Sequence, residues 1–208
     1  MLLKNKELHL RKIVSGGQTG VDRAALDAAV AAGIPIGGWC PKGRLAEDGV
    51  ISLEYPLRET VSRLYRERTG LNVMDSDGTL ILAEKILSGG TALTKGFADK
   101  YAKPLLVVNP ADSVSIGKIK KWLTANKIKV LNVAGPREST RPGSYDQAYK
   151  LLGEVLSATQ KKEFRIQNSG VRMEPGNSRN RGTVAMTDNP MEGCALSQPS
   201  SDPGVTIH

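Results

Sequence analysis

Residues 13–29 read I-V-S-G-G-Q-T-G-V-D-R-A-A-L-D-A-A: a short apolar run, a glycine-rich turn and an alanine-rich segment in direct succession. The run Lys12–Ser15 predicts a buried strand. In Val21–Ala32 the apolar residues recur at helical spacing, and Gly33 ends the predicted helix. A strand that leads through glycines into a helix is the repeating unit of α/β proteins, so this stretch predicts where the sheet begins.

The chain up to residue 159 repeats this alternation. The other predicted strands are Ile34–Trp39, Thr79–Ala83, Leu105–Val108 and Lys129–Val133. The other predicted helices are Thr91–Tyr101, Ser115–Asn126 and Ser144–Leu156, with a polar helix or turn over Glu59–Arg68. Strands that alternate with crossover helices indicate an α/β, Rossmann-like fold, in which a doubly wound, mostly parallel sheet carries helices on both faces.

The predicted domain organisation has three parts. Residues 1–10 are a leader, residues 11–159 form the Rossmann-like ligand-binding domain, and residues 160–208 are a tail. The tail is rich in Ser, Asn, Gly and Pro and shows neither helical nor strand periodicity, so we expect it to be disordered.

The composition of the chain limits the classes of ligand that we expect it to bind. The net charge is +8, and a positive field favours phosphates, nucleotides or nucleic acid. The chain has only two Trp, five Tyr and two Phe, which is few for a groove that stacks single-stranded bases, so we do not expect it to bind nucleic acid.

The sequence also indicates where the protein is located. No apolar run reaches the roughly 18 residues of a membrane span, and the start lacks a secretory signal. Two distant cysteines fit a reducing compartment. We predict a cytoplasmic protein with no membrane contact.

In a doubly wound sheet, ligands bind at the carboxyl ends of the strands, in the loops that lead into helices. Two such loops supply candidate residues for holding an anion: Gly16, Gly17, Gln18, Thr19, Gly20 and Arg23 in the first, and Gly89, Gly90 and Thr91 in the second. Glycine lets backbone N–H groups approach an anion, and a helix N-terminus adds unpaired donors. The alternative is a plain tight turn, in which Asp22 or Thr91 only caps its helix.

A third loop adds Gly135 and Arg137 after the strand Lys129–Val133. An arginine there can make a two-pronged contact with a phosphate or carboxylate. The alternative is a surface arginine that is solvated or paired with Glu138.

A fourth loop, residues 37–44, contains Trp39, Cys40 and Lys42. The indole can stack on a planar heterocycle and Lys42 adds charge, whereas a single tryptophan or cysteine near a strand end more often packs in a core. Asp77 precedes the central strand, where it can bind a cation or a pair of ribose hydroxyls, or simply form a turn. We predict no metal ligands.

Catalytic side chains are scarce. His9 lies in the leader and His208 is the last residue, so no Ser/His/Asp or Cys/His set can be built within the domain. An acid–base enzyme would have to rely on Asp, Glu or Lys. The pattern favours binding over catalysis, and we assign no catalytic residue.

Six ordered segments over residues 11–157 resemble the family of molybdenum cofactor carrier proteins. They are residues 13–29 quoted above, G-I-P-I-G-G-W-C-P-K-G-R-L-A-E-D-G (33–49), Y-P-L-R-E-T (55–60), D-S-D-G-T-L-I-L (75–82), G-G-T-A-L-T (89–94) and L-N-V-A-G-P-R-E-S (131–139). The resemblance implies a non-catalytic carrier or storage protein, a homo-oligomer that we expect to be a tetramer, and transient contact with enzymes that make or accept the cofactor.

The ligand that this resemblance implies is the molybdenum cofactor, a molybdopterin whose dithiolene chelates oxidised molybdenum and whose side chain ends in a phosphate. The resemblance places the anion on Gly16–Gly20 and Gly89–Thr91. It gives Arg23, Lys42 and Arg137 the role of supplying positive charge.

A more distant resemblance leads to cytokinin-activating phosphoribohydrolases and DNA-uptake processing proteins. The hydrolases carry P-G-G-x-G-T-x-x-E; here Ser88 replaces the proline, and Thr94 or Lys95 stands where the acid is needed. This argues against hydrolysis. A nucleotide sensor or nucleotide-processing enzyme is the second hypothesis, and its acids would be Asp22, Asp77 and Glu84.

Overall fold

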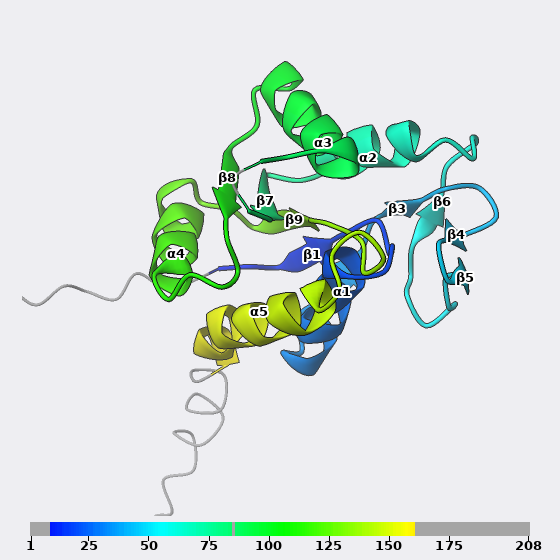
Figure 1. Cartoon of the computed structure of the whole chain (residues 1–208). Coiled ribbons are helices and arrows are strands. Elements are labelled where there is room, and N and C mark those ends of the chain that lie inside the picture. The colour runs from blue at the N-terminus through cyan, green and yellow to red at the C-terminus, as the bar shows by residue number, and fades with distance from the viewer. Residues whose placement is uncertain (1–8, 85, 161–208) are drawn as a thin grey trace, which may run out of the picture. The chain divides into compact units, whose positions relative to one another are not determined.

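Five parallel strands form the central sheet of the computed structural model, which describes residues 9–84 and 86–160. The strands are β1 (Lys12–Val14), β2 (Ile36–Gly37), β7 (Gly78–Leu82), β8 (Leu105–Val108) and β9 (Val130–Ala134). Their order across the sheet is β2-β1-β9-β7-β8, and every pairing between neighbours is parallel (Figure 1). The chain therefore winds outward from β1 to β2, crosses to β7 and β8, and returns to insert β9 in the middle.

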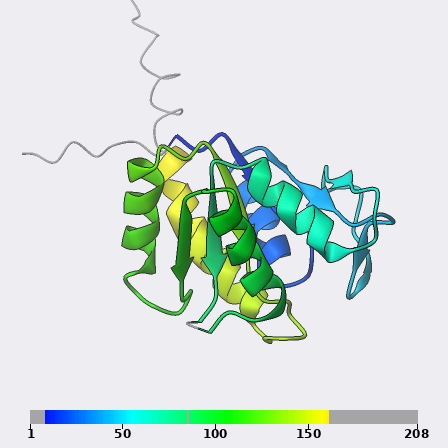
Figure 2. The same ribbon diagram turned by 90° about the horizontal axis from the view of Figure 1, so that it is seen from above.

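Helices cover both faces of this sheet. They are α1 (Val21–Ala31), α2 (Tyr65–Met74), α3 (Gly89–Lys100), α4 (Ser115–Ala125) and α5 (Ser144–Gln160). On one face α5 packs against α1 and α4, and on the other α2 packs against α3 (Figure 1). Figure 2 looks onto the face that α2 and α3 cover. The predicted α/β, Rossmann-like fold is confirmed.

The core explains why the sequence takes this arrangement. Leu80 and Leu82 of β7, like Val133 of β9, have no exposed surface, as expected for interior strands of a sheet covered on both faces. On α1 the inward positions are mostly alanines, and Ala24 and Ala25 are fully buried. Small side chains let α1 lie close to α5 and to the sheet.

One predicted strand, Ile34–Trp39, is wrong in its extent. The structure divides it at Gly38, whose φ of 131° belongs to a region that favours glycine. Before this residue β2 pairs with β1, whereas after it β3 (Trp39–Cys40) pairs with β6 (Arg58–Glu59) in a separate two-stranded sheet.

The predicted helix or turn over Glu59–Arg68 is also displaced. Glu59 ends β6, and the helix α2 begins at Tyr65 and continues to Met74. Asn72 explains the shift, because its side chain accepts a hydrogen bond from the Trp39 N–H (2.8 Å) and donates one to the Trp39 carbonyl (3.0 Å). These long-range bonds fix the helix in a place that local periodicity does not report.

A short antiparallel hairpin of β4 (Leu45–Ala46) and β5 (Gly49–Val50) completes the described structure. The predicted leader, apart from residues 9 and 10, and the predicted tail from residue 161 lie outside the described residues.

Candidate functional site

Three loops meet at the carboxyl edge of the sheet. β7 leads to α3 on one face while its neighbour β9 leads to α5 on the other, which is the topological switch point where open α/β sheets bind ligands. An ion pair of 2.7 Å between Glu84, after β7, and Arg141, before α5, joins two of the loops. The third loop follows β1. Its Ser15 hydroxyl donates a hydrogen bond to the carbonyl of Val133 near the end of β9 at 2.8 Å, which connects this loop to the neighbouring strand.

The loop after β1 is covered by an arginine from α2. A Cβ atom added to Gly16 would lie 1.8 Å from Nη1 of Arg68 and 2.8 Å from a carboxylate oxygen of Asp22. The guanidinium group therefore occupies the space that any larger residue at position 16 would fill. This contact is the physical reason for glycine at that place, and it brings a positive charge directly onto the backbone of the loop.

Arg68 is held by a buried ion pair. Its Nη1 lies 3.2 Å from Oδ2 of Asp22, and their side chains are only 13% and 5% exposed. Burial raises the pKa of Asp22, and the nearby Arg68 guanidinium opposes that rise. The Nε–H of Arg68 is buried and has no hydrogen-bond acceptor among the described residues. A buried donor without an acceptor costs about 1–3 kcal/mol, which an acceptor supplied from outside would recover.

A second arginine approaches from the loop after β9. The guanidinium carbon of Arg137 lies 4.8 Å from the ring centroid of Tyr65, and that of Arg68 lies 5.8 Å from the same centroid. Arg137 is half-buried and forms no ion pair within the part of the chain that is described. Its neighbour Glu138 binds the start of α5 instead, so the alternative of an Arg137–Glu138 pair is not what the structure shows.

We call Gly16, Tyr65, Arg68 and Arg137 the carboxyl-edge cluster. It combines two guanidinium groups, an aromatic ring and a glycine without a side chain, and among the described residues its one ion pair is that of Arg68 with Asp22. Guanidinium groups of this kind bind phosphate or carboxylate oxygens in pairs. The sequence reasoning missed Tyr65 and Arg68, although their i, i+3 spacing places both on one face of any helix through residues 65–68.

Other residues of the first loop attach the β4–β5 hairpin. The side-chain oxygen of Gln18 accepts the N–H of Thr19 (3.0 Å) and of Glu47 (2.9 Å), and the Thr19 hydroxyl donates to the Glu47 carboxylate. Arg23 pairs with Asp48 and donates to the carbonyl of Gly17 at 3.1 Å. Thr19 and Arg23 therefore hold the hairpin through the Thr19 hydroxyl and the two terminal nitrogens of Arg23, whereas the buried Nε of Arg23 has no hydrogen-bond partner among the described residues.

Gln18 keeps one free donor. The residue is 3% exposed, and its Nε2 has no hydrogen-bond partner among the described residues. Like Nε of Arg68, this nitrogen is a buried donor that an acceptor atom of a ligand would satisfy.

The remaining predicted glycines are placed in different ways. Gly17 and Gly20 have φ values of 72° and 73°, and added Cβ atoms would collide with Leu57 and with the carbonyl of Pro136. A Cβ on Gly135 would lie 2.4 Å from Val21. Gly20 therefore lets the first loop approach the backbone after β9, whereas Gly17 and Gly135 make room for the side chains of Leu57 and Val21.

The start of α3 shares the carboxyl edge. Gly89 and Gly90 are exposed with open space around them, and the hydroxyl of Thr91 donates to the Ser88 carbonyl at 2.7 Å. The sequence predicts that Thr91 either helps to hold an anion or caps its own helix, and in the structure its hydroxyl is bound at the start of that helix. Within the described residues, no hydrogen bond or ion pair joins this segment to Gly16 or Arg137.

Trp39, Lys42 and Asp77 lie outside the carboxyl-edge cluster. The indole of Trp39 carries the Arg58 guanidinium 4.1 Å from its ring centre. Lys42 is exposed in the loop after β3. Asp77 precedes β7 at the opposite, amino edge of the sheet, where its carboxylate accepts the N–H groups of Lys129 and Val130 at 2.8 Å each. We leave these three residues out of the anion site.

Glu138 fixes the loop that carries Arg137. Its carboxylate accepts hydrogen bonds from the N–H of Tyr145 (2.9 Å), the N–H of Gly143 and the hydroxyl of Ser144 (3.0 Å), all at the start of α5. The backbone hydrogen bonds from Tyr145 and Gly143 lower the pKa of Glu138. Its ionised form is therefore the form that the folded protein stabilises.

This predicts a pH-dependent effect of Glu138→Gln. A carboxylate whose pKa is lowered by folding stabilises the fold above the unfolded pKa, about 4.3, and loses that effect as pH falls through the folded value. We expect the variant to lose about 1 kcal/mol of unfolding free energy at pH 7, as for loss of a helix cap, and to converge on the parent below pH ~4. Urea unfolding over this pH range measures it. Glu154→Gln, on the exposed side of α5, should show no such trend; a pH-independent loss in Glu138→Gln would contradict the assignment.

The described residues contain no group of three or more His, Cys, Asp or Glu side chains that could hold a metal ion. Within the same part of the chain, no helix is both long and apolar enough to cross a membrane. Cys40 is a buried free thiol, and Cys194 lies outside the described residues.

Comparison with known proteins gives two matches. Residues 13–156 match the model of the circularly permutated YpsA SLOG family. A crystal structure of a protein from Syntrophus aciditrophicus SB, named "putative molybdenum carrier protein", is 48% identical with a TM-score of 0.69, and the match covers 72% of this chain and 96% of that one. A search of curated proteins found no match.

Proposed function

The chain belongs to the circularly permutated YpsA SLOG family, and from this premise we propose that it binds and protects the molybdenum cofactor as a non-catalytic carrier or storage protein. The solved relative, whose name says that it carries molybdenum, supports the choice of cargo. The carboxyl-edge cluster supports the mode of binding, because it offers cationic groups and buried donors where this fold receives a ligand.

The observation that carries the proposal is that Arg68 lies over Gly16 and shares the Tyr65 ring with Arg137. The phosphate of the cofactor would lie against the backbone of the first loop, between these two guanidinium groups. Nε of Arg68 and Nε2 of Gln18 are the buried donors that its oxygens or those of the pterin would satisfy. Tyr65 offers a flat surface next to the same guanidinium groups.

Molybdenum itself is cargo, since the dithiolene of the cofactor chelates it. The part that this chain plays toward an oxo-metal group is to supply positive charge and N–H donors, and Gly89–Thr91 at the start of α3 is the second loop proposed for that role. Thr19 would contribute only if the hairpin around Glu47 moved away, whereas Arg23, with its terminal nitrogens bound to Asp48 and Gly17, keeps one buried Nε–H without an acceptor among the described residues.

The acids at the carboxyl edge support binding without turnover. Asp22 is paired with Arg68 and Glu84 with Arg141, so both carboxylates are engaged by cations. The Arg141 hydrogen bond lowers the pKa of Glu84, which disfavours its use as a general acid. Asp77 lies at the other edge of the sheet. We propose that none of these three residues acts as a catalyst.

The test is the ligand load of the full chain incubated, without oxygen, with cofactor released from a molybdenum enzyme. Pterin is measured by fluorescence after oxidation, and molybdenum by mass spectrometry. The proposal requires both at about one per chain. A chain that takes up no pterin, but retains or hydrolyses nucleoside monophosphates, would replace the proposal with the nucleotide-processing hypothesis.

Arg137→Gln tests the site within this proposal. Removing one charge-assisted contact of about 1.5–3 kcal/mol should weaken cofactor binding roughly 10- to 100-fold, because Arg137 forms no ion pair within the described residues. Arg11→Gln is the matched control: it removes the same charge beside the amino end of β1, and we expect affinity within twofold of the parent. Equal weakening in both variants would mean that only overall charge matters, and the site would be wrong.

Three further proposals concern the location of the protein, its oligomeric state and its partner enzymes. We propose a cytoplasmic homo-tetramer that makes transient contact with enzymes that synthesise or accept the cofactor. Light scattering of the full chain after gel filtration tests the oligomeric state, and a monomer under all conditions would contradict it.

A further inference from the structure

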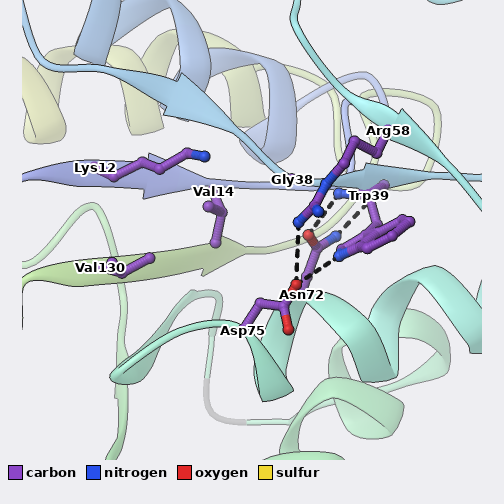
Figure 3. A pocket seen from close by; sticks show the side chains of 8 residues that line it. All are labelled: Lys12, Val14, Gly38, Trp39, Arg58, Asn72, Asp75 and Val130. Atoms are coloured by element: carbon purple, nitrogen blue, oxygen red, sulfur yellow. Dashed lines mark hydrogen bonds and ion pairs between the residues drawn. The ribbon is translucent and has the colours of Figure 1, made fainter.

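A pocket lies apart from the residues of the carboxyl-edge cluster, none of which lines it. It has a volume of about 310 Å³ and is lined by Lys12, Val14, Gly38, Trp39, Arg58, Asn72, Asp75 and Val130 (Figure 3). We call it the α2-end pocket, because it lies at the C-terminal end of α2. From Arg68 to Asp75 is seven residues, or roughly 10 Å along a helix axis, so one end of α2 serves the cluster and the other serves this pocket.

The floor of the pocket is the sheet itself. Ile13 packs in the core under α1, so its neighbours Lys12 and Val14 point to the opposite face of β1. Val14 and Val130, from the adjacent strands β1 and β9, form an apolar surface there. An apolar floor at a pocket of this size favours a small ligand with an apolar body.

One wall is formed by stacked planar groups. The Arg58 guanidinium lies over the Trp39 ring at 4.1 Å, and Asp75 binds both groups, accepting from the indole Nε1 at 2.8 Å and from Arg58 at 3.2 Å (Figure 3). Asn72 holds the Trp39 backbone with two hydrogen bonds. A preformed wall of an indole and a stacked guanidinium suits a planar ligand.

The charge in the pocket is incompletely balanced. Asp75 neutralises Arg58, whereas the Lys12 ammonium forms no hydrogen bond or ion pair within the described part of the chain. The Lys12 side chain runs along the sheet (Figure 3). A Cβ added to Gly37 would lie 2.8 Å from the Nζ of Lys12. The charged side chains of the pocket, Lys12, Arg58 and Asp75, leave one positive charge without a partner among the described residues, which favours a monoanion over a dianion such as a phosphate monoester.

From the apolar floor, the flat wall and the unpaired Lys12, we propose that the α2-end pocket binds a small aromatic monocarboxylate. The carboxylate pairs with the Lys12 ammonium, and the ring lies between the Val14–Val130 floor and the Trp39–Arg58 wall. This site is independent of the proposed carrier function, which depends on the opposite end of α2.

The test uses the fact that the chain has two tryptophans, Trp39 and Trp122. In the full chain carrying Trp122→Phe, Trp39 is the single indole, and its fluorescence is titrated with benzoate. We expect a saturable change with a Kd of about 0.1–1 mM. Benzamide and phenyl phosphate should bind at least roughly tenfold more weakly, since one lacks the charge and the other carries two.

Lys12→Met in this background should weaken benzoate binding by about tenfold or more, while Lys118→Met, which removes the same charge from the exposed side of α4, should leave it unchanged. Circular dichroism and the unfolding midpoint show that each variant is folded. The proposal is overturned by an absence of saturation up to about 20 mM benzoate, by equal binding in Lys12→Met, or by competition between inorganic phosphate and benzoate, which would place the ring at the carboxyl-edge cluster.

Discussion

Replacing Arg68 with methionine is expected to abolish measurable cofactor binding and to destabilise the fold at the same time. The guanidinium lies on Gly16 and neutralises the buried carboxylate of Asp22. Removing one partner of a buried ion pair costs about 3–5 kcal/mol, because the remaining charge is left without compensation. The loss of the phosphate contact adds a decrease in affinity of roughly 100-fold. Chemical unfolding and the cofactor-load measurement check the two effects.

The two effects of Arg68→Met are separated by adding Asp22→Asn. The double variant has no unpaired buried charge, so we expect it to regain most of the lost unfolding free energy while cofactor binding stays lost. Recovery of binding together with stability would show that Arg68 acts only through the fold. In that case the anion site would have to rest on Arg137 and the loop backbone alone.

The fold could be predicted from the sequence because it is encoded in local patterns of apolar residues. Apolar runs such as Thr79–Ala83 and helical spacing such as Ser115–Asn126 depend on neighbouring residues alone, and both of these elements appear within one residue of their expected bounds. Since parallel strands place their carboxyl ends at one edge, the loops after β1, β7 and β9 could be predicted as neighbours without knowing the strand order.

The carboxyl-edge cluster depends on contacts that no local pattern encodes. Arg68 reaches Gly16 across more than fifty residues, and Asn72 binds the Trp39 backbone to hold α2 where that reach is possible. The same dependence on long-range contacts explains why the sequence does not predict the partners of Thr19 and Arg23. Their types suit an anion, but the acids that engage them, Glu47 and Asp48, come from a hairpin whose place the sequence does not reveal.

Gly38→Ala is expected to be the most destabilising glycine substitution outside the anion site. The residue has φ 131°, and an added Cβ would lie 2.2 Å from the Ser15 carbonyl oxygen and 2.9 Å from Oδ1 of Asn72. The Ser15 carbonyl is backbone of the first loop and cannot rotate away, and Oδ1 is held by the Trp39 N–H. Backbone strain and overpacking of about 1–3 kcal/mol each give an expected loss of roughly 2–6 kcal/mol in the free energy of unfolding.

Gly117→Ala makes the same chemical change with the opposite expected sign. Gly117 lies within α4, and an added Cβ would have no atom within 4 Å. Alanine in an exposed helix is favoured over glycine by about 0.5–1 kcal/mol, so this variant should be more stable than the parent. Urea unfolding of both variants measures the difference. Were Gly38→Ala to unfold at the same urea concentration as Gly117→Ala, the close approach of β2 to the first loop would be wrong, and with it the route by which Asn72 and α2 bring Arg68 to Gly16.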